Sequence, residues 1–127
     1  MARYSPHIPP RIVIAEDEVL TRLAVATELR DNGFEVREAS NAEEALTVLE
    51  CTTTHIDALF TDIDMPGSMN GLELALRARQ SRPRLGVLVT SGKHMISDDF
   101  VLTRSRFVPK PYDISEIPRI LDDLIEP

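Results

Sequence analysis

The chain has 127 residues, with 14 basic and 21 acidic side chains, a formal net charge of -7 and 43% hydrophobic residues. This length fits one domain with a core of its own, and the near-average hydrophobic fraction argues against wholesale disorder. The excess of acids argues against a nucleic-acid-binding protein, because backbone contacts with DNA or RNA need clustered Lys and Arg.

The first ten residues contain three prolines and no periodic pattern. We therefore expect a flexible N-terminal tail over residues 1–10 and one domain over residues 11–127. The N-terminus lacks the apolar core of a signal peptide, and no apolar run approaches the ~18 residues of a membrane span. The single cysteine, Cys51, cannot form an internal disulfide. These features predict a cytoplasmic protein without membrane contact.

Short apolar runs alternate with helical patterns along the rest of the chain, which predicts a parallel sheet with helices on both faces. The predicted strands are residues 11–15, 34–39, 56–61, 85–90 and 106–108. The first four predicted helices are residues 18–31, 40–51, 71–79 and 95–103, the last having the weakest pattern. A fifth helix is expected over residues 116–125.

Local signals place the ends of three helices. Asn32-Gly33 is a stop signal for the first helix. Ser40 is the predicted cap of the second helix, with Glu43 reaching back to it. In the last helix, a cap at Ser115 would leave Pro118 in the first turn, where the missing N–H of proline breaks no hydrogen bond.

Acidic side chains follow two of the predicted strands. Glu16 and Asp17 come directly after residues 11–15, and Asp62 comes directly after residues 56–61. The carboxyl ends of parallel strands share one edge of the sheet, so the three carboxylates should meet there. Two like charges ~4 Å apart repel by about 1 kcal/mol in water and about 4 kcal/mol at an effective dielectric near 20. A Mg²⁺ ion with oxygen ligands offsets this repulsion, so the cluster predicts a metal-assisted phosphoryl site.

Two further motifs lie at the last two strands: Thr90-Ser91-Gly92-Lys93 and Phe107-Val108-Pro109-Lys110-Pro111-Tyr112. Together with Glu16-Asp17 and the Asp62 segment, they resemble the receiver domain of two-component response regulators over residues 11–126. Each motif alone occurs often by chance, but four in the right order at strand ends are hard to explain otherwise. The resemblance implies a flavodoxin-like α/β fold, a doubly wound five-stranded parallel sheet of order 2-1-3-4-5 with helices on both faces.

The resemblance also implies a role for each residue of the cluster. Asp62 would be the phosphoacceptor, and Lys110, followed by a cis peptide bond to proline, would contact a phosphoryl oxygen. Asp17 and Asp62 would bind Mg²⁺, or Mn²⁺ in its place, through their side chains. Glu16 would act through a metal-bound water, and Asp64 would contribute its backbone carbonyl.

A switch is implied as well. Ser91 would be the hydroxyl that bonds the phosphoryl group, with Thr90 as the alternative. Phe107 would be the aromatic residue that turns inward once the hydroxyl has moved. Residues 95–125 would form the surface that reports the phosphorylated state, and a homodimer through the same surface is conceivable.

The expected function is that of a single-domain response regulator. It would accept a phosphoryl group on Asp62 from a histidine kinase or a phosphotransfer protein, in a Mg²⁺-dependent reaction, and signal by binding an effector protein that the sequence does not identify. It would be a switch, not an enzyme, and would catalyse only its own phosphorylation and slow dephosphorylation. Two alternatives stay open: a receiver fold that binds partners without phosphorylation, and, less favoured, a small aspartate-dependent phosphohydrolase.

Overall fold

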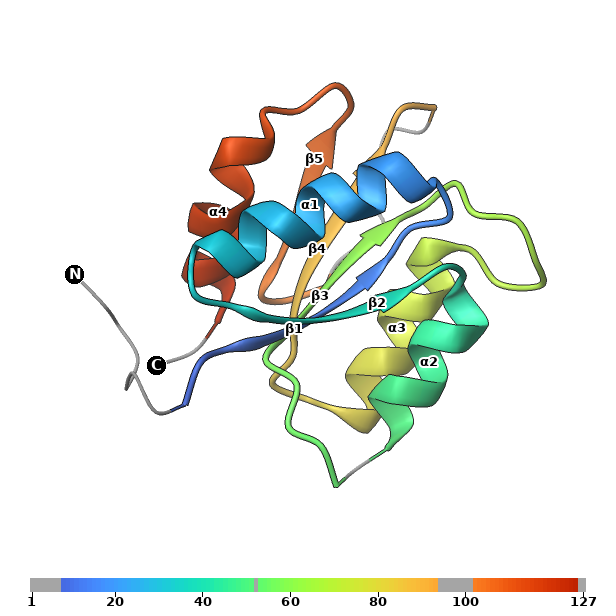
Figure 1. The fold of residues 1–127 in the computed structure, drawn as a ribbon. Coiled ribbons are helices and arrows are strands. Elements are labelled where there is room, and N and C mark those ends of the chain that lie inside the picture. The colour runs from blue at the N-terminus through green and yellow to red at the C-terminus, as the bar shows by residue number, and fades with distance from the viewer. Residues whose placement is uncertain (1–7, 52, 94–101, 126–127) are drawn as a thin grey trace.

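A computed structural model describes residues 8–51, 53–93 and 102–125, and within them five parallel strands form one sheet in the order β2-β1-β3-β4-β5 (Figure 1). The strands are β1 (Arg11–Ala15), β2 (Glu35–Ala39), β3 (Ala58–Asp62), β4 (Gly86–Ser91) and β5 (Ser105–Pro109). The helices are α1 (Val19–Asp31), α2 (Ala42–Glu50), α3 (Gly71–Ser81), the short 3-10 helix η1 (Ile114–Glu116) and α4 (Ile117–Leu124). The predicted sheet and its strand order are confirmed.

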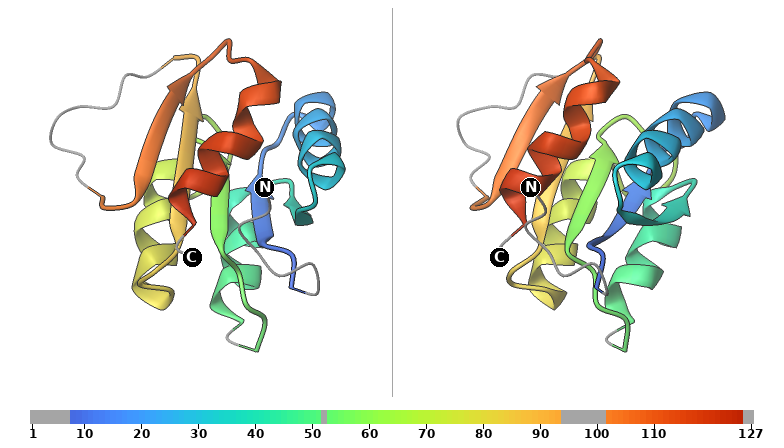
Figure 2. Two further views of the ribbon diagram at one scale, coloured as in Figure 1. Left: turned by 90° about the vertical axis from the view of Figure 1, so that its left-hand side faces the viewer. Right: turned by 60° about the vertical axis from the view of Figure 1, so that its left-hand side comes forward.

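Helices cover both faces of the sheet, as the turned views in Figure 2 show, and an apolar layer lies between the helices and the sheet on each face. Successive strand residues point to opposite faces. In β3, Leu59 therefore packs in the layer under α2 and α3, whereas Phe60 packs in the layer under α1 and α4. All residues of β3 and β4 are buried, which explains why these strands read as continuous apolar runs instead of alternating ones.

The start of α2 differs from the prediction by one residue. Asn41, not Ser40, caps the helix, and its Oδ1 accepts a hydrogen bond from the backbone N–H of Glu44 (2.7 Å). The carboxylate that reaches back is that of Glu44, which accepts from the backbone N–H of Ser40 (3.0 Å). Glu43 instead accepts from the hydroxyl of Ser68 (2.6 Å). Asparagine is as good a cap as serine, so the cap moves by one residue: the N–H of Glu44 is satisfied in place of that of Glu43, and the N–H of Ser40 is bonded by Glu44.

The last helix also begins differently from the prediction. Asp113, not Ser115, is the cap, and its carboxylate accepts from the backbone N–H of Ser115 (3.0 Å) at the start of η1. The α-helix α4 then begins at Ile117, which makes Pro118 its second residue. The interpretation of Pro118 as a first-turn proline is confirmed, although the residue that caps the turn is another.

Other expectations have mixed outcomes. The stop after α1 is confirmed, because Gly33 adopts the left-handed conformation with φ of 90°. The helix predicted over 95–103 and the tail predicted over 1–10 fall mainly on residues outside those described. Among the described residues, no helix combines the length and the apolar character needed to cross a membrane.

The strand ladder extends further toward the predicted site than expected. Asp62 is the last residue of β3 and pairs with Thr90, and Ser91 is the last residue of β4 and pairs with Pro109. These side chains are therefore attached to a hydrogen-bonded sheet and not to loops. Gly71, the first residue of α3, packs so close that a Cβ atom there would lie 2.0 Å from the carbonyl oxygen of Asp62. Only glycine permits this approach.

Candidate functional site

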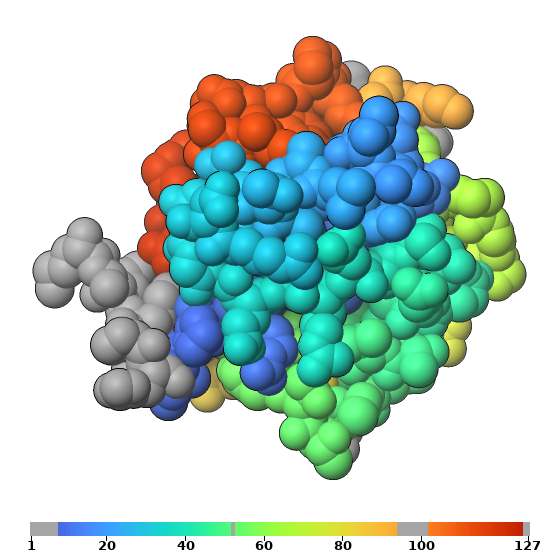
Figure 3. Space-filling model, in the orientation of Figure 1, coloured from blue at the N-terminus to red at the C-terminus, as the bar shows by residue number. Residues whose placement is uncertain are grey.

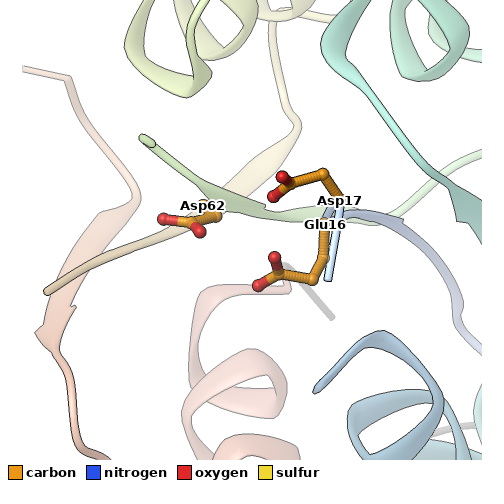
Figure 4. A group of neighbouring side chains, drawn as sticks. All are labelled: Glu16, Asp17 and Asp62. Carbon is orange, nitrogen blue, oxygen red and sulfur yellow. The ribbon is translucent and has the colours of Figure 1, made fainter. Parts of the chain in front are cut away.

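Three carboxylates meet at the C-terminal edge of the sheet, as predicted. Glu16 and Asp17 follow β1 and Asp62 ends β3, and one oxygen from each lies within 4.8 Å of the others (Figure 4). Asp17 is exposed, whereas Glu16 and Asp62 are only 1% and 3% exposed. Negative charges this close, two of them buried, are unfavourable unless cations offset them.

The only cation that ion-pairs with this cluster among the described residues is Lys110, which directly follows β5. Its Nζ lies 2.9 Å from Oδ2 of Asp62 and 3.7 Å from Oε1 of Glu16. The Lys110-Pro111 peptide bond is cis, as the resemblance implied. Burial by itself lowers the pKa of Lys110, but the hydrogen bond to Asp62 and the charge of Glu16 outweigh it and raise the pKa. The lysine therefore stays charged.

Glu16 is the least satisfied of the three acids. Its Oε2 accepts from the backbone N–H of Glu18 (3.1 Å), whereas its buried Oε1 has no hydrogen-bond partner within the described part of the chain. Burial, aided by the charge of Asp62, raises the pKa of Glu16 to about 7 even though the bond from Glu18 lowers it. Carboxylate oxygens with an unmatched negative charge are the donor set that Mg²⁺ prefers, so these residues fit that ion.

Hydrogen bonds through Asp64 connect Asp62 to Ser91 at the end of β4. The backbone N–H of Asp64 donates to Oδ1 of Asp62 (3.1 Å). The carboxylate of Asp64 accepts from the hydroxyl of Ser91 (2.7 Å), and the Ser91 oxygen accepts from the backbone N–H of Lys93 (3.1 Å). The hydroxyl of the neighbouring Thr90 is buried without a hydrogen-bond partner among the described residues. Asp62, Asp64 and Ser91 thus form a connected group.

Phe107 lies on the same face of the sheet as Ser91. It pairs across the strands with Val89, two residues before Ser91, and it packs half-buried against the layer under α2 and α3. The structure therefore brings six of the predicted site residues together at this edge of the sheet: Glu16, Asp17, Asp62, Asp64, Ser91 and Lys110. Thr90 precedes Ser91 in β4 with its side chain on the opposite face, and Phe107 lies farther along the sheet, paired with Val89. The reporting surface predicted over residues 95–125 includes residues outside those described. Its roles in reporting phosphorylation and in dimerisation stay predictions.

Comparison with known proteins identifies this arrangement. A family profile described as the response regulator receiver domain matches residues 12–122. The chain belongs to this receiver-domain family. Receiver domains are regulatory switches that interact with histidine kinases and downstream effectors, and they are not typical enzymes. An acidic cluster such as that of Glu16, Asp17 and Asp62 is typical of a receiver Mg²⁺ site.

Individual relatives agree with the family assignment. The chain is 31% identical over 117 residues to the transcriptional regulatory protein PdtaR of Mycobacterium tuberculosis, covering 87% of this chain and 54% of PdtaR. Among solved structures, the receiver domain of the hybrid histidine kinase CckA is 34% identical, with a TM-score of 0.77 over 91% of this chain and 99% of that one. The response regulator TrrA of Thermotoga maritima, solved in complex with Mg²⁺-BeF, is 28% identical, with a TM-score of 0.75 over 91% and 99%. The chain spans from 12% to 54% of the length of the first curated relatives it matches.

Two residues of this receiver domain support the site and were missed by the sequence analysis. Arg22 donates to the backbone carbonyl of Glu16 (2.9 Å) and pairs with Glu38 (3.3 Å), which holds the end of β1 against α1. Tyr112 packs its ring edge-on against Phe60, with 6.2 Å between ring centroids, and burial raises its pKa to about 12. A basic residue one turn into the helix after an acidic pair was the available signal for Arg22.

The receiver domain also has an apolar groove beside the site. The groove, of about 540 Å³, lies between α1 and the turn that follows β5, and its lining includes Leu20, Ala24, Lys110, Tyr112 and Ile114. Leu20 is 80% exposed. Figure 3 shows the α1 surface in blue and cyan lying next to the orange surface of the chain's last elements.

Proposed function

We propose that residues 11–127 act as a phosphorylation switch in which Asp62 is the phosphoacceptor. The observation that carries this proposal is the carboxylate of Asp62, held 2.9 Å from Nζ of Lys110 beside Glu16 and Asp17. Together with a bound Mg²⁺ ion, a nucleophilic carboxylate, one fixed cation and further acidic oxygens supply what phosphoryl transfer needs, because that reaction depends mainly on positioning and charge stabilisation.

In the proposed reaction, a carboxylate oxygen of Asp62 attacks the phosphorus of a phosphohistidine on the partner protein. The P–N bond breaks, an acyl phosphate forms on Asp62, and the departing imidazole takes up a proton. Lys110 then transfers its contact from the carboxylate to a phosphoryl oxygen, a role that suits a compact ammonium group. No separate general base is needed.

The metal site proposed for this reaction uses the same cluster. Asp17 and Asp62 would bind Mg²⁺, or Mn²⁺, with their side chains, Glu16 would act through a water molecule, and Asp64 would use its backbone carbonyl. When bound, the ion neutralises and orients phosphoryl oxygens. The complex of TrrA with Mg²⁺-BeF supports the assignment by analogy, and the unpartnered oxygen of Glu16 supports it within this chain.

The output of the proposed switch runs through Ser91 and Phe107. The Ser91 hydroxyl would bond the phosphoryl group, and Phe107, on the same face of the sheet, would turn inward as the hydroxyl moves. Effector proteins would recognise the altered surface around β5 and α4.

Phosphorylation by a small donor tests the proposal directly. We expect acetyl phosphate and Mg²⁺ to add one phosphoryl group to the chain, detected by intact mass, and Asp62→Asn to abolish the adduct. Asp123→Asn, which changes an exposed acid on α4, is the matched control and should be phosphorylated normally. Turnover of phosphoesters without an adduct would favour a phosphohydrolase, and neither adduct nor turnover would favour a binding module.

We propose that the phosphodonor protein docks in the groove beside the site. It extends to Lys110, which contacts Asp62, so a helix seated between α1 and Tyr112 would place its phosphohistidine next to the acceptor. The exposed Leu20 would then be buried in the complex.

The groove assignment predicts a selective defect. We expect Leu20→Glu to slow transfer from the most active histidine kinase in a panel by about tenfold, the usual cost of losing one buried apolar anchor, while acetyl phosphate still phosphorylates the variant at the normal rate. Leu76→Glu is the matched control, because Leu76 is an exposed leucine on α3, on the other face of the sheet. Equal effects of the two variants on kinase transfer would contradict the assignment.

A further inference from the structure

The hydroxyl of Ser91 is fully engaged in the unphosphorylated protein. It donates to Oδ2 of Asp64 at 2.7 Å and accepts from the backbone N–H of Lys93 at 3.1 Å. Ser91 is 1% exposed and ends β4, so its backbone is held by the pairing with Pro109. A serine hydroxyl has one proton, and here that proton is used on the Asp64 carboxylate.

This geometry makes two bonds of Ser91 mutually exclusive. An ionised carboxylate and a phosphoryl group are both strong acceptors without a proton to give, so each can only accept from Ser91. A phosphoryl group on Asp62 can therefore receive the Ser91 proton only after Asp64 has released it. The two acceptors lie two residues apart in the chain, and the backbone N–H of Asp64 already contacts Oδ1 of Asp62 (3.1 Å).

We propose that the side chain of Asp64 is a positioning residue that holds the Ser91 hydroxyl in the unphosphorylated state and competes with the phosphoryl group for it. This inference rests on the proposed function, and it goes beyond the backbone-carbonyl role assigned to Asp64 above. Phosphorylation exchanges one charge-assisted hydrogen bond of Ser91 for another, and the difference between the two sets how completely the switch turns.

Electrostatic repulsion also favours the transfer of the Ser91 hydrogen bond from Asp64 to the phosphoryl group. A phosphoryl group adds negative charge at Asp62, two residues from the carboxylate of Asp64, and the two groups repel. Repulsion drives the Asp64 side chain away from the phosphorylated site at the moment when Ser91 is needed there. Phe107 lies on the Ser91 face of the sheet, paired with Val89, so in this proposal the rearrangement of Phe107 would follow the release of Ser91.

A double-mutant cycle in two states tests the proposal. The unfolding equilibrium constant is measured for the unmodified chain, Asp64→Ala, Ser91→Ala and the double variant, first without additions and then with saturating Mg²⁺ and beryllofluoride, a phosphoryl mimic. In the first state we expect the two substitutions to be coupled by about tenfold or more, the range for a hydrogen bond to a charged group. In the second state we expect the coupling to fall to within about twofold of additivity, because Ser91 has changed its acceptor.

Two further variants make the cycle specific. Asp64→Asn keeps an acceptor oxygen but loses the charge, so it should retain part of the coupling with Ser91. Asp64→Ala combined with Thr90→Val should show no coupling in either state, because the Thr90 side chain points to the opposite face of β4 from Ser91. A purely structural role of Asp64 predicts the same coupling with and without the phosphoryl mimic.

The failure of this inference can be told apart from that of the proposed function. If the unmodified chain takes up neither beryllofluoride nor a phosphoryl group, the proposed function fails and this inference fails with it. If the chain takes up the mimic and the coupling persists unchanged, or if no coupling exists in the first state, only the role of Asp64 is refuted.

Discussion

Charged side chains differ in how well they are paired at the two ends of the parallel strands. At the C-terminal edge, Lys110 ion-pairs with Asp62 and Glu16, and within the described part of the chain the buried Oε1 of Glu16 lacks a hydrogen-bond partner. At the opposite edge, the guanidinium of Arg82 donates to three backbone carbonyls, those of Leu49 (2.8 Å), Cys51 (2.8 Å) and Thr54 (2.6 Å).

The charged groups at one edge stabilise the fold, whereas those at the other edge are available for chemistry. Arg82 satisfies backbone carbonyls at and after the C-terminal end of α2, and a cation at this end of a helix also interacts favourably with the helix dipole. Arg79 acts similarly near the end of α3, donating to the carbonyl of Leu85 (2.7 Å). Glu16 and Asp62 instead share the single ammonium group of Lys110, which leaves negative charge that a metal ion would neutralise. Removing the charge of Arg82 should therefore lower the stability of the fold, whereas removing the charge of Glu16 should raise it.

The largest expected effect is at Arg82. We expect Arg82→Ala to lower the free energy of unfolding by about 3 kcal/mol, because three carbonyls lose a charged donor and the connection from α2 to β3 loses its anchor. Urea denaturation measures the change. Arg119→Ala removes only exposed ion pairs on α4 and should stay within about 0.5 kcal/mol. A loss at Arg82 as small as that at Arg119 would break the comparison.

Removing the charge of Glu16 is expected to raise the free energy of unfolding instead of lowering it. The folded state raises its pKa from 4.5 to about 7, so the folded protein binds more protons than the unfolded chain between those values, and stability falls as pH rises through that window. We expect Glu16→Gln to stabilise the metal-free protein by about 2 kcal/mol at pH 8 and by almost nothing at pH 4.5.

Chemical denaturation across this pH range, in the presence of a chelator, measures the effect of Glu16→Gln. Glu35→Gln is the matched control, because Glu35 is an exposed partner of Arg11 at the other edge of the sheet. Destabilisation by Glu16→Gln at pH 8 would show that the carboxylate is stabilising there, contrary to the comparison drawn above.

The smallest effect is expected from Mg²⁺ itself. An ion that binds only the folded protein should stabilise it by about 1.4 kcal/mol at ten times its Kd. Protons compete with the ion for Glu16, so the gain in Tm on adding Mg²⁺ should be larger at pH 8 than at pH 5.5. Asp17→Asn should reduce the gain at both pH values. A gain that is independent of pH would place the ion away from Glu16.

The sequence predicted which three carboxylates meet because its signals there are local. Glu16, Asp17 and Asp62 each follow an apolar run, and parallel strands bring such positions to one edge. Helix starts were predicted less accurately: Ser40 and Asn41 are both good caps, as are Asp113 and Ser115, and composition cannot choose between neighbours of equal propensity. The ends of β3, β4 and β5 were each placed one residue too early, because ladder pairing, as between Asp62 and Thr90, extends beyond the apolar residues.

The sequence by itself determined the order of strands and helices, the identity of the acidic cluster and the motif around Lys110, since each depends on residue types at short spacing. Only the tertiary structure decided that Lys110 contacts Asp62, that the Ser91 proton is held by Asp64, and that Leu20 borders a groove next to the site. The two hydrogen bonds join residues 48 and 27 positions apart in the chain, and the groove is lined by residues from both ends of the domain. Contacts over such distances depend on how the helices and strands pack together, which short-range patterns do not encode.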